Sequence, residues 1–244
     1  MLYELIKNKV YYRVFDRTYA NSSGIYSYHK SKDAANLAQV NQNIDNIKNE
    51  LEVHHLQILN QVHGDEIYYS SEDSCASQPA ADASCTDKKN VALGILTADC
   101  VPILITNTDG TVIGAAHCGW KSAKLGIIPK LQKKMETLGA ESMTAIIGPA
   151  IAQKSYEVDM SYYKSFVEQD NSTRDLFIAS TRESHFMFDL VGYVKKGLER
   201  AGVSIFHNFS EDTYSNPEKY PSYRRSCHEG STYSQNILST IVIK

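Results

Sequence analysis

The sequence predicts a mixed α/β fold: a single domain over residues 1–244, with a mixed β-sheet layered with helices (α-β-α). Segments with helical apolar periodicity alternate with short β-branched runs along the chain. Hydrophobic residues make up 42% and charged residues 22% of the 244 positions, which is an ordinary globular composition. The sequence contains no internal repeat, low-complexity tract or linker that would divide it, so we expect one domain.

The first elements follow from apolar spacing. Residues 10–15 form the opening strand, and a helix over 32–52 follows with Ser31 as its N-cap. Five apolar residues recur in that helix at spacings of three and four, which gives one buried stripe. They are Leu37, Val40, Ile44, Ile47 and Leu51. Alternating apolar residues predict strands at 55–63 and 67–69.

The middle of the chain continues the alternation of strands and helices. The polar stretch 70–84 is expected to be a loop, and a β-hairpin fills roughly 91–117. A helix over about 121–138 follows, in which Pro129 is expected to cause a kink. A short buried strand at 144–148 ends this part of the chain.

The last elements are marked by helix-start and helix-stop residues. A helix begins at Asp159, and another covers 189–201 and ends at Gly202. Strands at 203–207 and 236–243 complete the prediction.

The predicted hairpin brings Cys100 and His117 together. Its two β-branched runs meet at Asp109-Gly110, which favours a type I′ turn. In that register Pro102 faces His117, and Cys100 is a diagonal neighbour of His117 on the same face. A thiolate and an imidazole placed in this way can share a metal ion or act as a nucleophile–base pair. The alternative without chemical function is that Cys100 is an inert, buried, small hydrophobic residue.

His63 is the candidate for a third metal ligand. It ends a predicted strand at the Gly64-Asp65 turn, so its ring can project at an end of the sheet. A catalytic zinc takes three protein ligands, whereas a structural zinc normally has four. Copper is the less favoured metal, since a His₂Cys set also suits blue copper but eight scattered histidines do not suit several copper ions. A cysteine hydrolase that uses Cys100 and His117 without metal stays open.

Composition argues against several functional classes. The net charge is −3 and the sequence has no basic block, so no nucleic-acid partner is expected. Charge interrupts the N-terminus within four residues, and no apolar run is long enough to cross a bilayer. Five cysteines, an odd number, without an export signal favour free thiols in a cytoplasmic setting.

Several short motifs occur in order along the chain. They are Gln61-Val-His63-Gly64, Ala81-Asp-Ala83 with Thr86, Thr97-Ala-Asp-Cys100-Val-Pro102, Ala115-Ala-His117-Cys-Gly-Trp120, Gly148-Pro-Ala-Ile151 with Tyr156-Glu-Val158, and Ser222-Tyr-Arg-Arg225. Together these motifs resemble the YfiH family over about residues 55–243. That family is catalogued both as multicopper polyphenol oxidases ("laccase domain") and as purine nucleoside phosphorylases. The family's N-terminal Arg-x-Gly-Gly-x-Ser stretch is altered here, because residues 17–27 have no paired glycines.

The resemblance implies a zinc ion bound by His63, Cys100 and His117. It implies phosphorolysis of adenosine, guanosine, inosine or methylthioadenosine, and deamination of adenosine. The expected partners are therefore a purine nucleoside and phosphate. Some bacterial members of the family are also implicated in peptidoglycan-precursor editing, which is a further alternative.

The two reactions need different helper groups. Deamination requires a proton shuttle near a zinc-activated water, and Asp82 or Asp99 is expected to serve. Asp99 is also a candidate for orienting a ligand histidine. Phosphorolysis requires cations or N–H donors for phosphate. The residues expected to bind substrate are Gln61, Lys121, Arg224 and Arg225.

Overall fold

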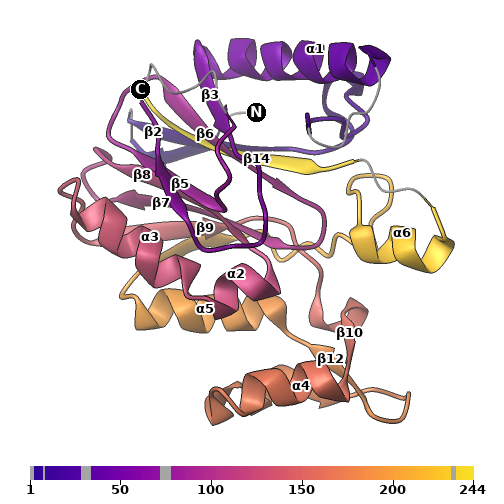
Figure 1. Ribbon diagram of the computed structural model, residues 1–244. Helices are drawn as coiled ribbons and strands as arrows, with labels where there is room; N and C mark the ends of the chain where they lie inside the picture. The colour runs from indigo at the N-terminus through magenta and orange to yellow at the C-terminus, as the bar shows by residue number, and fades with distance from the viewer. Residues whose placement is uncertain (1–2, 8, 29–33, 72–77, 232–234) are drawn as a thin grey trace.

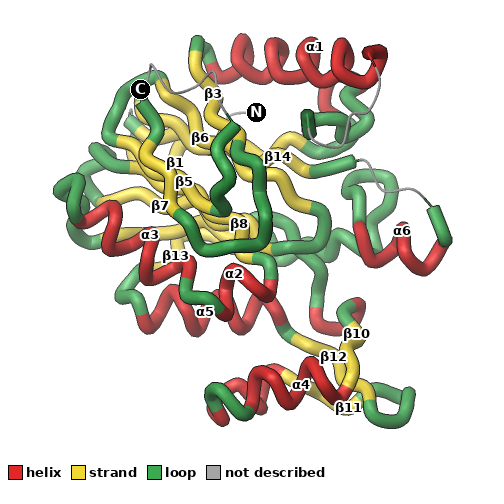
Figure 2. The backbone as a smooth tube through the Cα atoms, in the orientation of Figure 1, coloured by secondary structure: helices red, strands yellow, loops and turns green. Residues whose placement is uncertain are grey.

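Two β-sheets lie face to face at the centre of the molecule, and helices cover their outer faces (Figure 1). The computed structural model describes residues 3–7, 9–28, 34–71, 78–231 and 235–244. Figure 2 shows α1 on one side of the strands and α3 and α5 on the other. The predicted mixed α/β class is confirmed, and the β layer between the helices consists of two stacked sheets.

The first sheet has five strands and lies beneath α1 (Ala34–Leu51). Its order is β1 (Tyr3–Ile6), β2 (Val10–Phe15), β14 (Ile237–Ile243), β6 (Val91–Thr97) and β3 (His55–Ile58). The apolar stripe of α1 is buried through Val40, Ile44, Ile47 and Leu51, while Leu37 is exposed. The helix is therefore confirmed, and the predicted N-cap Ser31 lies outside the described residues.

The second sheet has six strands, and α3 (Ile127–Glu136) and α5 (Leu190–Arg200) pack on its outer face. Its order is β13 (Ser204–Asn208), β9 (Met143–Ile147), β7 (Val101–Asn107), β8 (Ile113–Cys118), β5 (Ala83–Thr86) and β4 (Ile67–Tyr69). Residues from both sheets fill the layer between them, including Leu93 and Ile95 of β6 and Ile113 and Ala115 of β8. This layer ends at the candidate site described below.

A smaller unit of three strands and a helix extends from the main body (Figure 2). It consists of β10 (Glu157–Asp159), β12 (His185–Phe188), β11 (Phe177–Ala179) and α4 (Met160–Val167). The predicted start of α4 is confirmed, because the Asp159 carboxylate accepts a hydrogen bond from the Tyr162 N–H at 2.8 Å. Neither the three strands nor α6 (Tyr223–Glu229) was predicted. β1 was also not predicted, so the strand over 10–15, expected to open the fold, is the second strand. Short 3₁₀ helices lie at Tyr19–Asn21, Gln153–Ser155 and Asn171–Leu176.

The predicted helix over 121–138 is wrong as a single helix. The chain forms α2 (Trp120–Lys124) and then α3, with Gly126 between them at φ 84°. Pro129 lies in the first turn of α3, where its missing N–H leaves no helix hydrogen bond unmade. The break is therefore caused by the left-handed glycine and not by the proline.

The predicted hairpin has the expected register between its two strands. Its turn type and its extent over residues 91–117 were predicted wrongly. Pro102 pairs with His117, as expected. Of the two turn residues only Gly110 has a positive φ, 64°, so the turn is not type I′. The Asn107 C=O accepts a hydrogen bond from the Gly110 N–H at 2.9 Å and closes the turn. Residues 91–97 belong to the five-stranded sheet, because the chain changes sheets at Asp99 (φ 93°).

Two other boundaries differ from the prediction. β3 ends at Ile58 instead of residue 63, and His63 has a left-handed backbone with φ 59°. The expected loop over 70–84 is wrong at its end, where β5 begins at Ala83, and residues 72–77 of it lie outside the described residues. The other predicted strands and the helix over 189–201 are confirmed within one or two residues. Among the described residues, no helix combines the length and apolar character needed to span a membrane.

Replacement of Gly126 by alanine tests the break between α2 and α3. We expect Gly126→Ala to lower the free energy of unfolding by about 1 kcal/mol, because a Cβ disfavours positive φ. The measurement is urea unfolding followed by circular dichroism. Gly126→Asn is the control. Asparagine tolerates a positive φ better than alanine does, so this variant should lose less of the free energy of unfolding. Equal stability of the alanine variant and the wild type would contradict a left-handed break.

Candidate metal centre and adjoining cavities

One fully buried carboxylate, Asp82, organises the candidate centre. Its oxygens accept hydrogen bonds from the backbone N–H groups of residues 62, 63 and 64 at 2.7–3.0 Å. The same carboxylate lies 2.7 Å from Nδ1 of His117. Burial alone would raise the pKa of Asp82, but the hydrogen bonds from His117 and the backbone outweigh burial and lower it. Asp82 therefore remains an anion that joins the 62–64 turn to β8.

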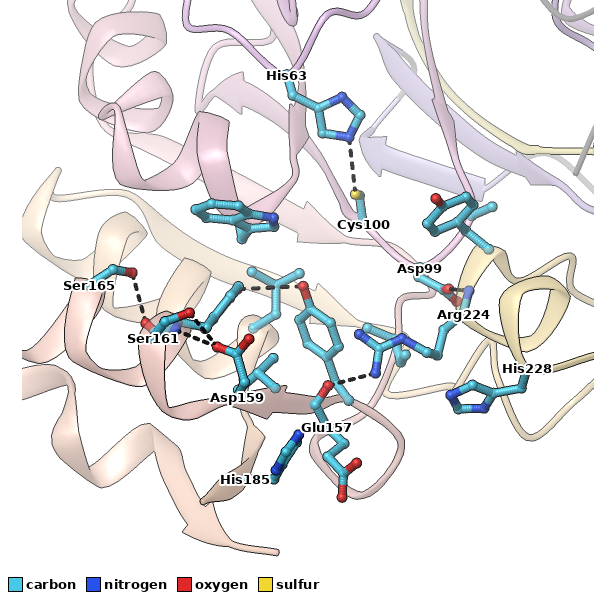
Figure 3. Close-up of a pocket in the computed structure, with 18 of the residues that line it drawn as sticks. His63, Asp99, Cys100, Glu157, Asp159, Ser161, Ser165, His185, Arg224 and His228 are labelled. Atoms are coloured by element: carbon cyan, nitrogen blue, oxygen red, sulfur yellow. Dashed lines mark hydrogen bonds between the residues drawn. The ribbon is translucent and has the colours of Figure 1, made fainter. Parts of the chain in front are cut away.

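These hydrogen bonds orient both histidines toward Cys100. Because Nδ1 of His117 is bonded to Asp82, its Nε2 is the ring atom left to bind a metal. His63 is held on a left-handed turn, and its Nε2 lies 3.9 Å from the Cys100 Sγ (Figure 3). The two imidazole rings meet edge to face with centroids 4.7 Å apart.

The three side chains fit a metal ion in number, type and spacing. One ligand atom from each of His63, Cys100 and His117 lies within 4.8 Å of the other two. Ligands of a tetrahedral zinc are separated by roughly 3.3–3.6 Å, so small side-chain movements would close this set around an ion. Among the described residues this is the one group of three or more His, Cys, Asp or Glu side chains placed to hold a metal.

Gly119 makes room for the three candidate ligands at the start of α2. A Cβ at this position would lie 2.9 Å from Cδ2 of His63 and 3.2 Å from Sγ of Cys100. Both separations are closer than side chains normally tolerate, so the backbone approach requires glycine. Sequence reasoning placed Gly119 beside the site but assigned it no role.

Without a metal, Cys100 and His117 form a charged pair. Burial would raise the pKa of the Cys100 thiol, but the neighbouring His117, and then His63, lower it to about 6. Burial would lower the pKa of His117, but Cys100 and Asp82 raise it to about 9. The metal-free pair is therefore a thiolate and an imidazolium at neutral pH. Metal binding would release the imidazolium proton.

Two cavities meet at the cluster formed by His63, Cys100 and His117, which we call the ligand cluster. We call the first the aromatic cavity: its volume is about 760 Å³, and Trp120, Tyr156 and Tyr162 line it. The second, the strand-end cavity, has a volume of about 680 Å³ and lies at the ends of β6 and β8. Both volumes are in the range of small-molecule sites. The residues that line both cavities are His63, Ala98, Cys100, Trp120 and Tyr223.

Asp99 precedes Cys100 in the chain, but its carboxylate forms hydrogen bonds at the start of α6 and not with the cluster. Its oxygens accept hydrogen bonds from Thr213 Oγ1 at 2.7 Å, Ser222 Oγ at 2.9 Å and the Arg224 N–H at 2.7 Å. Burial raises the pKa of this carboxyl. Asp99 thus anchors the start of α6, and its carboxylate makes no hydrogen bond to a ligand histidine. The partner of His117 is Asp82.

Two of the expected substrate-binding side chains form hydrogen bonds with the protein backbone. The Gln61 amide donates to the Leu96 carbonyl at 2.7 Å and accepts from the Leu96 N–H at 2.8 Å. The Arg225 guanidinium donates to the carbonyls of residues 213, 214 and 220 at 2.6–3.0 Å. Gln61 still lines the strand-end cavity, whereas Arg225 lines neither cavity.

The other two expected substrate-binding side chains face the cavities. Lys121 is exposed and lines the strand-end cavity, with its Nζ 5.5 Å from the Trp120 ring. Within the described part of the chain its ammonium group makes no hydrogen bond or ion pair. Arg224 lines the aromatic cavity, stacks over Tyr156 at 5.0 Å and donates from Nη1 to the Glu157 carbonyl at 2.6 Å.

The aromatic wall was missed by sequence reasoning. Trp120 and Tyr162 are in contact, with ring centroids 5.0 Å apart, and Tyr156 lies beside Tyr162 at 6.2 Å. Trp120 and Tyr156 belong to the quoted motifs, but nothing in the sequence indicates that they gather with Tyr162. Figure 3 shows Arg224 and His228 on one flank of this cavity, with Glu157 and His185 at the end away from Cys100.

Comparisons with known proteins agree on one family. The family model described as "Multi-copper polyphenol oxidoreductase laccase" matches residues 12–240. A Rickettsia conorii protein named "Purine nucleoside phosphorylase RC0672" is 46% identical over 240 residues, which is 98% of this chain and 99% of that protein. "Purine nucleoside phosphorylase YfiH" of Escherichia coli is 29% identical over 68% of this chain and 67% of its own length. The crystal structure of Neisseria meningitidis protein NMB0706 superposes with a TM-score of 0.86 at 25% identity, covering 100% of this chain and 98% of that one.

Replacement of Asp82 tests its role as the support of both histidines. We expect Asp82→Asn to weaken zinc binding by about 10- to 100-fold, because an amide supports the His117 ring less well. Competition with a chromophoric chelator measures the affinity. Asp65→Asn is the matched control, since Asp65 belongs to the same turn but pairs with Lys130 at the surface. Equal zinc affinity in both variants would show that Asp82 does not orient the ligands.

The reactivity of Cys100 tests the charged pair in metal-free protein. Cys227 is an exposed free thiol on α6, so it is replaced by serine for this measurement. In chelator-treated Cys227→Ser protein, we expect alkylation of Cys100 by iodoacetamide to rise with pH through a midpoint near 6. The thiol is protonated and unreactive below that pH, and the thiolate reacts above it. His117→Ala should move the midpoint upward, because the neighbouring positive charge is lost. A midpoint at an ordinary cysteine value in the unsubstituted site would refute the pairing.

Proposed function

The chain belongs to the multi-copper polyphenol oxidoreductase laccase family, and we propose that it is a metal-dependent purine nucleoside phosphorylase. The observation that supports this activity most directly is the 46% identity, over nearly the whole chain, to a protein of that name. The site is consistent with the proposal, because two cavities of suitable size adjoin one three-ligand cluster.

Zinc is the proposed metal. Two imidazoles and one thiolate form a donor set that zinc accepts, and three protein ligands leave a position open for catalysis. A zinc ion at His63, Cys100 and His117 would supply Lewis acidity beside the substrate. Copper remains the alternative metal, but a single cluster among the described residues does not supply the ligands of a multicopper centre.

The two cavities suggest where the parts of the substrates lie. A purine is flat and aromatic, so it would stack in the aromatic cavity against Trp120, Tyr156 or Tyr162. Phosphate needs cationic donors, which Lys121 and Arg224 present on either side of the cluster. In the reaction a phosphate oxygen bonds to C1′ of the ribose while the C1′–N9 bond breaks. The bonding electrons leave with the purine, which then takes up a proton.

Adenosine deamination is the second proposed activity, because three protein ligands are typical of hydrolytic zinc sites. It replaces the C6 amino group with oxygen from water and releases ammonia. Asp82 is bound by four fixed donors, so we propose it as the support of His117 and not as a freely moving proton shuttle. Asp99 is likewise proposed to position α6.

Product analysis with and without phosphate tests the proposal. With adenosine or inosine, we expect free purine and ribose 1-phosphate only when phosphate is present, and loss of turnover in Cys100→Ser. Lys121→Ala should raise the KM for phosphate by about tenfold, since a charge-assisted contact is lost. Lys133→Ala, an exposed lysine on α3, is the matched control and should leave KM unchanged.

Three outcomes would contradict the phosphorylase. Conversion of adenosine to inosine without any phosphate-dependent release of free purine and ribose 1-phosphate would leave deamination as the only activity. Absence of nucleoside turnover in zinc-loaded, folded protein would remove both proposed activities. Oxidation of phenols by a copper-loaded protein, without nucleoside turnover, would favour the oxidase.

A further inference from the structure

The hydroxyl of Thr97 is buried without a hydrogen-bond partner among the described residues. The residue is 1% exposed, and its Oγ1 has neither a side-chain nor a backbone partner. A buried polar group without a partner is costly and rare in folded proteins, so each case calls for a physical reason. Thr97 also belongs to the Thr97-Ala-Asp-Cys100 motif, in which it has had no assigned role.

Strand geometry directs Thr97 toward the cluster. Side chains two residues apart share a face of a strand, so Thr97 shares the face of Leu93 and Ile95, which lies between the two sheets. His117 shares the corresponding face of β8 with Ile113 and Ala115. Thr97 and His117 thus approach the same end of the layer between the sheets, and both line the strand-end cavity.

The other unpartnered buried hydroxyls among the described residues do not border the cluster. Ser84, Ser122 and Ser239 are equally buried, and none of them lines the aromatic or the strand-end cavity. In contrast, two further groups with spare hydrogen-bonding capacity line the strand-end cavity beside Thr97. The Asn60 side-chain amide and the Lys121 ammonium make no hydrogen bond within the described part of the chain. The strand-end cavity therefore holds neutral donors and acceptors next to the Lys121 ammonium.

We propose that Thr97 Oγ1, together with the Asn60 amide, binds a ribose hydroxyl of the nucleoside and selects ribonucleosides over deoxyribonucleosides. This inference rests on the proposed function. A hydroxyl both donates and accepts, which suits a sugar hydroxyl better than an anion or an aromatic ring. The aromatic cavity suits the purine and Lys121 suits phosphate, so the sugar joins them beside the cluster. A site built to bond a hydroxyl discriminates against analogues that lack it, because its own polar groups are then left unpaired.

The test compares three nucleosides in four proteins. The nucleosides are adenosine, 2′-deoxyadenosine and 3′-deoxyadenosine, each with saturating phosphate. The proteins are the wild type, Thr97→Val, Thr97→Ser and Ser239→Ala. Valine keeps the shape of threonine and removes the hydroxyl, and serine keeps the hydroxyl. Ser239→Ala removes an equally buried hydroxyl in the neighbouring strand β14, outside both cavities.

We expect the wild type to prefer adenosine over the deoxynucleoside that lacks the bonded hydroxyl. Thr97→Val should lower kcat/KM for adenosine by about tenfold and leave that deoxynucleoside nearly unchanged, so the preference collapses. Thr97→Ser should retain the preference, and Ser239→Ala should behave like the wild type. The Tm of Thr97→Val should equal or exceed that of the wild type, because a buried group without a partner is removed.

The failures of the two proposals are distinguishable. A folded, zinc-loaded wild type that turns over none of the three nucleosides overturns the proposed function and this inference with it. An active wild type whose preference for ribose is unchanged by Thr97→Val overturns this inference alone. A clear drop in the Tm of Thr97→Val also overturns it, because the hydroxyl would then serve the fold.

Discussion

The candidate centre depends on the buried carboxylate of Asp82. It accepts three backbone N–H groups of the 62–64 turn and holds the ring of His117. The backbone oxygen of Asp82 also accepts a hydrogen bond from the His117 backbone N–H at 2.7 Å. Asp82 therefore holds both the backbone and the side chain of His117. A charged group is tolerated without exposure to water because every donor around it is fixed in place. Loss of that anion would release both histidines together.

A second constraint is the change of sheet between β6 and β7. The three residues Ala98 to Cys100 cross from one sheet to the other, with a positive φ at Asp99. This short crossing places Cys100 in the cluster and Thr97 at the strand-end cavity. It also directs the Asp99 carboxylate to the start of α6, where Arg224 faces the aromatic cavity. One irregular segment thereby connects the ligand cluster with both cavities.

Local patterns predicted much of the fold and of the ligand cluster. The stripe of α1 and the register of Pro102 with His117 depend on neighbours in sequence or on a short turn, so they could be read from the chain. His63 was selected as the end of a strand, whereas it lies on a left-handed turn held by Asp82. The break at Asp99 was missed because apolar residues continue on both sides of it. The support from Asp82, the space left by Gly119 and the aromatic wall arise from long-range contacts that no local pattern reports.

X-ray absorption at the zinc edge, on protein purified without added metal, tests the central claim most directly. That claim is that His63, Cys100 and His117 form a metal centre held by Asp82. The account predicts near-stoichiometric zinc with one sulfur at about 2.3 Å and at least two nitrogens at about 2.0 Å. The sulfur should disappear in Cys100→Ala. A folded protein without metal, or with zinc bound only by oxygen ligands, would contradict the account.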